Sequence, residues 1–169
     1  MKSKESISEP GNVLNRIKRG LSGYVSYLAA CEMNQAFSEY VLYEPILRIL
    51  TARGYTVNCE FPCPGLPKPV GGGDCKKIDF EVNGHGQRFA MEVKWAKRTR
   101  LDVGQDHLKL DAFHNAAPAS RSFLCAFGRK SHIENLSLVN GTFTEFGVGV
   151  YADFRITKYG CRIYEISFG

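Results

Sequence analysis

The sequence lacks the long apolar runs that mark membrane-spanning segments. Within its 169 residues no apolar run approaches the ~20 residues that a helix needs to cross a bilayer. The N-terminal stretch MKSKESISEP is polar and lacks the apolar core of a signal peptide, so we expect a cytoplasmic protein with no membrane partner. We expect residues 1–10 to be a disordered tail and residues 11–169 to form a single domain.

Several common site motifs are also missing. The six cysteines include no C-x-x-C pair and the four histidines show no H-x-x-x-H spacing. A zinc hydrolase built on Cys59, Cys63 and Cys75 therefore stays only as an alternative. The stretch GGGD at 71–74 lacks the GK[ST] of a phosphate-binding P-loop. Without a secretion signal the cysteines are expected to be reduced thiols.

The charged residues are mildly biased toward the positive sign. The chain has 22 Lys and Arg against 17 Asp and Glu, a formal charge of +5. Basic residues form two groups in the sequence. The early group is Arg16, Lys18 and Arg19, and the later group is Lys94, Lys97, Arg98 and Arg100. Such groups are common on solvated faces, but they also suit a phosphate backbone. We predict that Lys97, Arg98 and Arg100 contact nucleic acid.

The order of predicted elements is that of an α/β or α+β domain around a mixed sheet. The pattern predicts helices at 12–33, 35–53 and 102–116, strands at 55–61, 77–82, 88–95 and 121–128, and a C-terminal hairpin from 146–154 and 161–168. Residues 62–73 hold four prolines and four glycines, which predicts a loop that could flank a site.

The predicted strand RFAMEVKW (88–95) carries two charged residues on one face. Because side chains alternate along a strand, its residues divide into two sets, Phe89, Met91, Val93 and Trp95 against Ala90, Glu92 and Lys94. The first set is core material. The second places a carboxylate and an ammonium group side by side, which calls for a chemical explanation.

The preceding strand KIDFEV (77–82) adds a second carboxylate. By strict alternation Asp79 faces away from its two apolar neighbours, and a hairpin turn over 84–87 then places Asp79 opposite Glu92. Two adjacent carboxylates repel each other unless a positive charge lies between them. Lys94 supplies part of that charge, and two oxygen ligands also suit Mg²⁺, which can polarise a phosphodiester and activate water.

This layout resembles the PD-(D/E)XK nuclease superfamily, also called the restriction-endonuclease-like fold. The resemblance covers 35–128 and rests on Asp79 followed, on the next strand, by an E-x-K motif of Glu92 and Lys94. Ile78 stands where many members have proline. The resemblance implies a restriction-endonuclease-like core with a central mixed sheet flanked by helices, to which this chain adds an N-terminal helix and a C-terminal hairpin.

The activity implied is that of a metal-dependent deoxyribonuclease. Asp79, Glu92 and Lys94 would be catalytic, the two carboxylates would bind Mg²⁺, and Mn²⁺ would substitute for it. DNA is the expected partner, and the sequence also leaves open RNA as a substrate and a homodimer as the active form. It does not decide between sequence-specific and structure-selective cutting.

Members of the family often add a glutamate from the helix before the first strand, for which Glu39 and Glu44 compete. On a helical wheel Glu39 shares the apolar face, whereas Glu44 lies nearly opposite that face, beside Arg48. A carboxylate on a buried face is costly unless it is paired or metal-bound, so Glu39 is the predicted metal ligand and catalytic residue. Pro45 could alter the helix register, which keeps Glu44 open.

The helix after the E-x-K strand would supply further polar groups. Gln105 and Lys109 share a helical face, and we assign Gln105 to catalytic support outside the direct metal ligands and Lys109 to a DNA phosphate. Leu108 and Leu110 are expected to point inward. Ordinary surface charges on this helix are the alternative.

A non-catalytic module of the same fold is the main competing hypothesis. Such a module would use the basic face to hold nucleic acid or a protein. The intact Asp/Glu/Lys set argues against it, because a module without catalysis has no reason to keep a like-charge pair.

Overall fold

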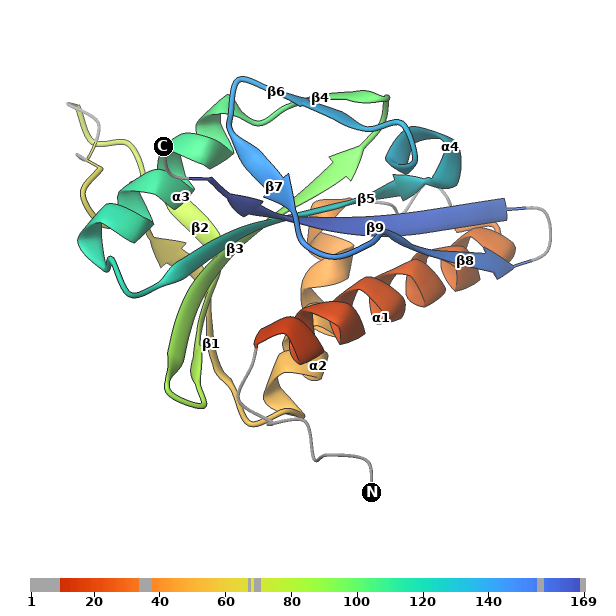
Figure 1. Ribbon diagram of the computed structural model, residues 1–169, viewed down its shortest axis with the longest axis horizontal. Helices are drawn as coiled ribbons and strands as arrows, with labels where there is room; N and C mark the ends of the chain where they lie inside the picture. Colours follow the sequence, from red (N-terminus) through yellow and green to blue (C-terminus); the bar gives the residue numbers. More distant parts are fainter. Residues whose placement is uncertain (1–9, 34–37, 67, 69–70, 155–156, 168–169) are drawn as a thin grey trace.

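Helices cover both faces of a mixed β-sheet in the computed structural model, which describes residues 10–33, 38–66, 68, 71–154 and 157–167 (Figure 1). The helices are α1 (Pro10–Ala30), the 3₁₀ helix η2 (Glu39–Leu42), α2 (Tyr43–Thr51), α3 (Gly104–Ala116) and α4 (Lys130–Ile133). The strands are β1 (Thr56–Pro62), β2 (Lys77–Gly84), β3 (Gln87–Ala96), β4 (Arg100–Asp102), β5 (Arg121–Arg129), β6 (Ser137–Val139), β7 (Phe143–Glu145), β8 (Val150–Phe154) and β9 (Thr157–Ile166).

The main sheet has the order β1-β2-β3-β5-β9-β7, and β8 pairs with the other half of β9. Its strand pairs are antiparallel except for β3 and β5, which run parallel on either side of α3 in the sequence. The α/β class, the mixed sheet, the N-terminal helix and the C-terminal hairpin are therefore confirmed. A small second sheet of β4 and β6 and the one-turn helix α4 were not predicted.

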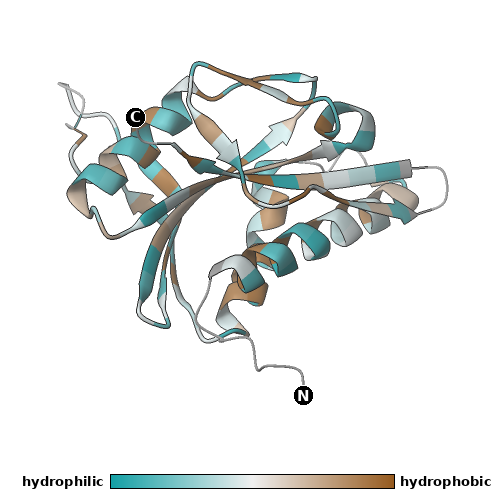
Figure 2. Ribbon diagram, viewed as in Figure 1, coloured by the Kyte–Doolittle hydropathy of each residue, from teal (hydrophilic) through white to brown (hydrophobic). Residues whose placement is uncertain are grey.

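The apolar residues divide into two layers, one on each face of the sheet. Helices α1 and α2 pack on one face through residues that include Leu14, Ile17, Leu21, Ile46 and Leu50. Helix α3 packs on the opposite face through Leu110 and Phe113. In Figure 2 hydrophilic and hydrophobic bands alternate along α1, as expected for a helix with one buried face.

Helix α1 is continuous through Gly20 and Gly23, although glycine lowers helix stability. Its Lys18 does not belong to a basic surface group, because the side chain is fully buried. The ammonium donates to the carbonyls of Phe146 and Val148 at 3.0 and 2.8 Å, which ties α1 to the connection between β7 and β8. No helix in the described ranges is long and apolar enough to span a membrane.

The second predicted helix is shorter than expected and has two parts. An α-helix cannot run through Pro45 from residue 35, because the proline ring would clash with the carbonyl of the residue four positions earlier. The chain instead forms η2 and begins α2 at Tyr43, so that Pro45 lies in the first turn, where proline is tolerated. Residues 34–37 and the predicted tail at 1–9 lie outside the described residues.

Strands β2 and β3 form the predicted hairpin. Its two-residue turn is formed by His85 and Gly86, which both have positive φ (53° and 73°), as primed turns require. The register pairs Glu81 with Ala90 and Phe80 with Met91, as expected from a turn over 84–87. The ladder ends at Phe80 and Met91, one residue before Asp79 and Glu92, and the Asp79 charge acts on Glu92.

Side-chain alternation holds in β3 but not throughout β2. Phe89, Met91 and Val93 lie in the core beside α1 and α2, while Ala90 packs on the α3 side, as predicted. In β2, however, Ile78 packs on the α3 side and Phe80 on the α1 side. The prediction that Asp79 faces away from both neighbours is therefore wrong, because the strand changes face at this residue.

Candidate functional site

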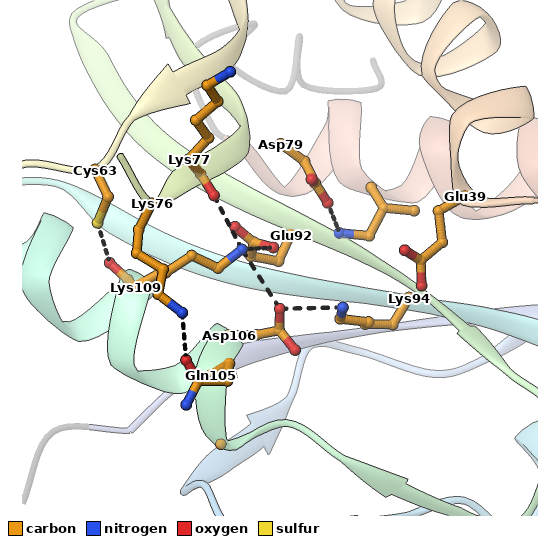
Figure 3. A network of polar contacts seen from close by, with 12 residues as sticks. Glu39, Cys63, Lys76, Lys77, Asp79, Glu92, Lys94, Gln105, Asp106 and Lys109 are labelled. Carbon is orange, nitrogen blue, oxygen red and sulfur yellow. Dashed lines mark hydrogen bonds and ion pairs between the residues drawn. The ribbon is translucent and has the colours of Figure 1, made fainter. Parts of the chain in front are cut away.

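Charged side chains from β2, β3 and α3 converge where β2 and β3 lie against α3 (Figure 3). Strand β2 supplies Asp79, and β3 supplies Glu92 and Lys94 from one face. Helix α3 adds Lys109 and Asp106. The predicted trio of Asp79, Glu92 and Lys94 is thus brought into one cluster, and two helical residues join it.

Asp79 is half-buried and held by hydrogen bonds at both oxygens. Its Oδ2 accepts the backbone N–H of Val93 at 2.7 Å, and its Oδ1 accepts the hydroxyl of Tyr43. Burial raises the pKa of Asp79 above its usual value, although these hydrogen bonds and the nearby lysines oppose that shift. A carboxylate has about four lone-pair sites, so Asp79 keeps acceptor capacity for a cation.

Glu92 is almost fully buried, with 1% of its surface exposed. Its Oε2 accepts the Lys109 ammonium at 2.6 Å, whereas its Oε1 is buried and has no hydrogen-bond partner among the described residues. Burial first, and the Asp79 charge second, raise the pKa of Glu92 well above its usual value. An orphaned carboxylate oxygen in such a place normally signals a ligand, an ion or an ordered water.

Opposite charges alternate through the rest of the cluster. Lys109 lies 3.6 Å from Asp106, and Asp106 lies 3.3 Å from Lys94. Burial acts to lower the pKa of Lys94, but Asp106 and then Glu39 outweigh it, and the net pKa is raised. Burial likewise opposes the charge of Lys109, but Glu92 and Asp106 raise its pKa overall, so both lysines are ammonium ions near neutral pH.

The donor set fits Mg²⁺ in its chemistry. Asp79 and Glu92 offer carboxylate oxygens, one of them buried and unpartnered, and Mg²⁺ needs only one or two protein carboxylates because it keeps several waters. In the described parts of the chain no group of three or more His, Cys, Asp or Glu side chains is arranged to hold a metal. The predicted three-carboxylate set of Asp79, Glu92 and Glu39 is therefore not preformed.

Glu39 lies at the Lys94 end of the cluster (Figure 3). Its Oε1 accepts the backbone N–H of Trp95 at 3.2 Å, and its charge acts on Lys94. Glu44 is exposed and pairs with Arg48 at 2.5 Å, as the helical wheel indicated. The structure thus brings Glu39, and not Glu44, to the E-x-K strand, although from η2 rather than from an α-helix.

One prediction for α3 is wrong. Leu108 is exposed and does not point inward, because only Leu110 of the two leucines shares the inward face with Asp106. Gln105 is exposed and its side-chain oxygen accepts the Lys76 ammonium at 2.8 Å, and its supporting role stays a prediction. Lys109 is placed in the site with its side chain 14% exposed, so its ammonium holds Glu92 instead of extending to an open DNA surface.

The predicted nucleic-acid residues Lys97, Arg98 and Arg100 are exposed at the end of β3 and the start of β4. Across the described ranges none of these three has a carboxylate within 4.0 Å. They follow directly after Lys94 on the same chain segment, and their charges are available to a polyanion beside the site.

The cysteines of the zinc alternative do not assemble. Cys59 is exposed, Cys75 is half-buried, and the buried Cys63 donates its thiol to the carbonyl of Lys109 at 3.3 Å. All six cysteines of the chain are free thiols.

Tyr43 is a site residue that sequence reasoning missed. Its ring packs against Phe80 with centroids 4.7 Å apart, and its hydroxyl is shared between Asp79 and Glu60. Burial and then the Asp79 hydrogen bond raise the pKa of Tyr43, so the hydroxyl stays protonated and acts as a donor. Nothing in the local sequence marks this tyrosine, because its partner lies 36 residues away.

For the predicted deoxyribonuclease, we expect Tyr43→Phe to lower cleavage about tenfold, because a hydrogen bond that positions Asp79, the carboxylate predicted to bind the metal, would be lost. The stability cost should be small, about 1 kcal/mol, since the ring and its packing remain. Single-turnover cleavage and thermal melting would measure the two effects. Tyr40→Phe is the matched control, because Tyr40 is 71% exposed. Equal rates for both variants would contradict this role of Tyr43.

Comparison of the chain with protein-family models, with curated proteins and with solved structures gave no match. The interpretation of the site therefore depends on its own geometry.

Proposed function

We propose that this protein is a Mg²⁺-dependent nuclease that hydrolyses phosphodiester bonds in DNA, with a restriction-endonuclease-like core. The observation that carries the proposal is the pair of carboxylates of half-buried Asp79 and buried Glu92, whose Oε1 has no partner among the described residues. Lys94 lies on the same strand as Glu92. The α/β sandwich around a mixed sheet, with a hairpin carrying this pair, supports the fold assignment.

Asp79 and Glu92 would hold the metal ion, which when bound polarises a phosphate oxygen and acidifies a water ligand. Tyr43 and the Val93 N–H keep the Asp79 carboxylate in place. Lys94 has 28% of its side chain exposed, and Asp106 fixes its ammonium at the open end of the cluster. From there it can orient the attacking water and stabilise negative charge on the phosphate.

The exposed Lys97, Arg98 and Arg100 would bind the DNA backbone beside the site. Contacts to phosphates fix the position of a duplex but carry no base information. Recognition of a base sequence would need loops or a second copy of the chain, whereas recognition of branched or single-stranded DNA would not.

A binding module without catalysis is the second candidate function, and one observation favours it. The Lys109–Glu92 ion pair already neutralises part of the carboxylate charge without any metal. A protein that only binds nucleic acid would keep this pair and would bind no Mg²⁺ at Asp79 and Glu92.

Cleavage should require Mg²⁺ or Mn²⁺ and stop with EDTA. Ca²⁺ should support DNA binding but little cutting, since its looser coordination and weaker acidity position water poorly. Supercoiled, linear and branched DNA, and single-stranded RNA, incubated with each metal would measure the dependence and the substrate class. Activity that survives thorough chelation would exclude the two-carboxylate mechanism, and binding without cutting in every metal would favour the binding module.

A further inference from the structure

Lys109 lies inside a shell of oxygen atoms that resembles the surroundings of a bound cation. Its Nζ is 2.6 Å from Glu92 Oε2, 3.0 Å from the carbonyl oxygen of Lys77 and 3.6 Å from Asp106 Oδ1 (Figure 3). Two carboxylates and a backbone carbonyl are also ligands that hard divalent ions accept. The side chain is only 14% exposed, so the ammonium is not a solvated surface charge.

The two oxygens of Glu92 are used differently. Oε2 is taken by Lys109, while Oε1 has no hydrogen-bond partner in the described part of the protein. Glu92 therefore offers one open coordination position, which it can share with Asp79, and one position already occupied by a positive charge.

The charge balance of the cluster suits one divalent ion. The carboxylates that act on Lys94 and Lys109 are those of Glu39, Asp79, Glu92 and Asp106. With all four carboxyl groups ionised, as Asp79 and Glu92 must be to hold a metal, the four negative charges and the two ammonium groups sum to a net charge of −2, which one Mg²⁺ would neutralise. A second Mg²⁺ would leave two positive charges in a nearly buried site before any phosphate arrives, which is costly.

We propose that Lys109 acts as a built-in second cation, so that this site binds a single divalent ion, at Asp79 and the open oxygen of Glu92. In two-metal nucleases a second ion stands about 3.5–4 Å from the first and helps to stabilise the reacting oxygens. Here the ammonium of Lys109 would provide that charge from a covalently fixed position. The inference depends on the proposed metal-dependent function and specifies the number of ions.

The number of bound Mn²⁺ ions tests the proposal without any DNA. Metal-free protein would be titrated with Mn²⁺, and bound ions counted by calorimetry and by the loss of the free-ion EPR signal. The wild type should bind one ion. Lys109→Met should bind two, because Glu92 Oε2, the Lys77 carbonyl and Asp106 are released from the ammonium and can ligate a second ion.

Lys109→Gln provides a second variant of different polarity in case the methionine variant does not fold, which circular dichroism would show. Lys76→Met is the matched control, since this lysine lies on the rim with its ammonium on Gln105 and should leave the count at one. Two ions in the wild type, or one ion in both folded Lys109 variants, would overturn the inference and leave the proposed nuclease intact. No bound Mn²⁺ in the wild type would instead remove the proposed metal-dependent function itself.

Discussion

Asp79→Asn and Glu92→Gln should each reduce DNA cleavage by about 10³-fold or more while the protein remains folded. Each substitution removes a charged oxygen from the proposed metal site, and losses of this size are usual when a group that stabilises transition-state charge is removed. The neutral side chains keep the shape of the site. In Asp79→Asn the single amide oxygen can accept from Val93 N–H, and the Tyr43 hydroxyl, which in the wild type binds the other oxygen of Asp79, can still donate to Glu60.

The melting temperature of both variants without metal should be unchanged or slightly higher. Burial raises the folded-state pKa of both carboxyl groups, so the folded protein is penalised once they ionise. Below the ordinary carboxyl pKa of about 4, the two protonated groups therefore make their full contribution to the free energy of unfolding. That contribution falls as the pH rises through their raised pKa values in the folded protein. The amide variants lack this loss, and their advantage over the wild type should grow as the pH rises above the ordinary carboxyl pKa.

Melting curves in EDTA at several pH values, together with single-turnover cleavage in Mg²⁺, measure both effects. Asp153→Asn is a suitable control, because Asp153 forms an exposed pair with Lys158 far along the chain from the site. If both site variants melted several degrees lower, the carboxylates would be structural, and the metal assignment would be wrong.

Glu39→Gln should lower cleavage by about 10²-fold, the second largest effect that we expect. Glu39 lies against the E-x-K strand, where its charge acts on Lys94 and its Oε1 accepts the Trp95 N–H. The glutamine carbonyl can keep that hydrogen bond, so the fold should persist, but Lys94 loses a negative neighbour that holds it. Affinity for Mg²⁺ should fall only modestly, since Glu39 belongs to no preformed metal group among the described residues.

Glu44→Gln is the matched control for Glu39→Gln. Glu44 is exposed and forms an i,i+4 pair with Arg48, and such pairs contribute only about 0.3–0.5 kcal/mol. Its cleavage rate should be close to that of the wild type. An inactive Glu44→Gln variant, together with a Glu39→Gln variant of normal activity, would show that Glu44 and not Glu39 faces the substrate.

The sequence alone determined the parts of the site that depend on neighbouring residues. Glu92 and Lys94 share a face because strand side chains alternate with a period of two. The short turn at His85 and Gly86 fixes the register of the hairpin as far as Phe80 and Met91, the pair just before Asp79 and Glu92. Local geometry was enough in these cases because few residues separate the partners.

Helix α3 shows where the same reasoning failed although a usable signal was present. Asp106, Leu110 and Phe113 are spaced i, i+4 and i+7, which puts all three on the inward face. Leu108 and Leu110, two residues apart, cannot share that face. Applied strictly, this rule predicts a buried aspartate in place of the exposed Gln105.

Only the tertiary structure decided which distant groups meet the carboxylates. The Tyr43 hydroxyl reaches Asp79 across 36 residues, and Lys109 reaches Glu92 across 17, with no local pattern that links them. These contacts depend on how α2 and α3 pack on opposite faces of the sheet, and that packing is set by burial of apolar surface summed over many residues. The change of face at Asp79, between Ile78 and Phe80, has the same origin, because each neighbour packs into a different layer.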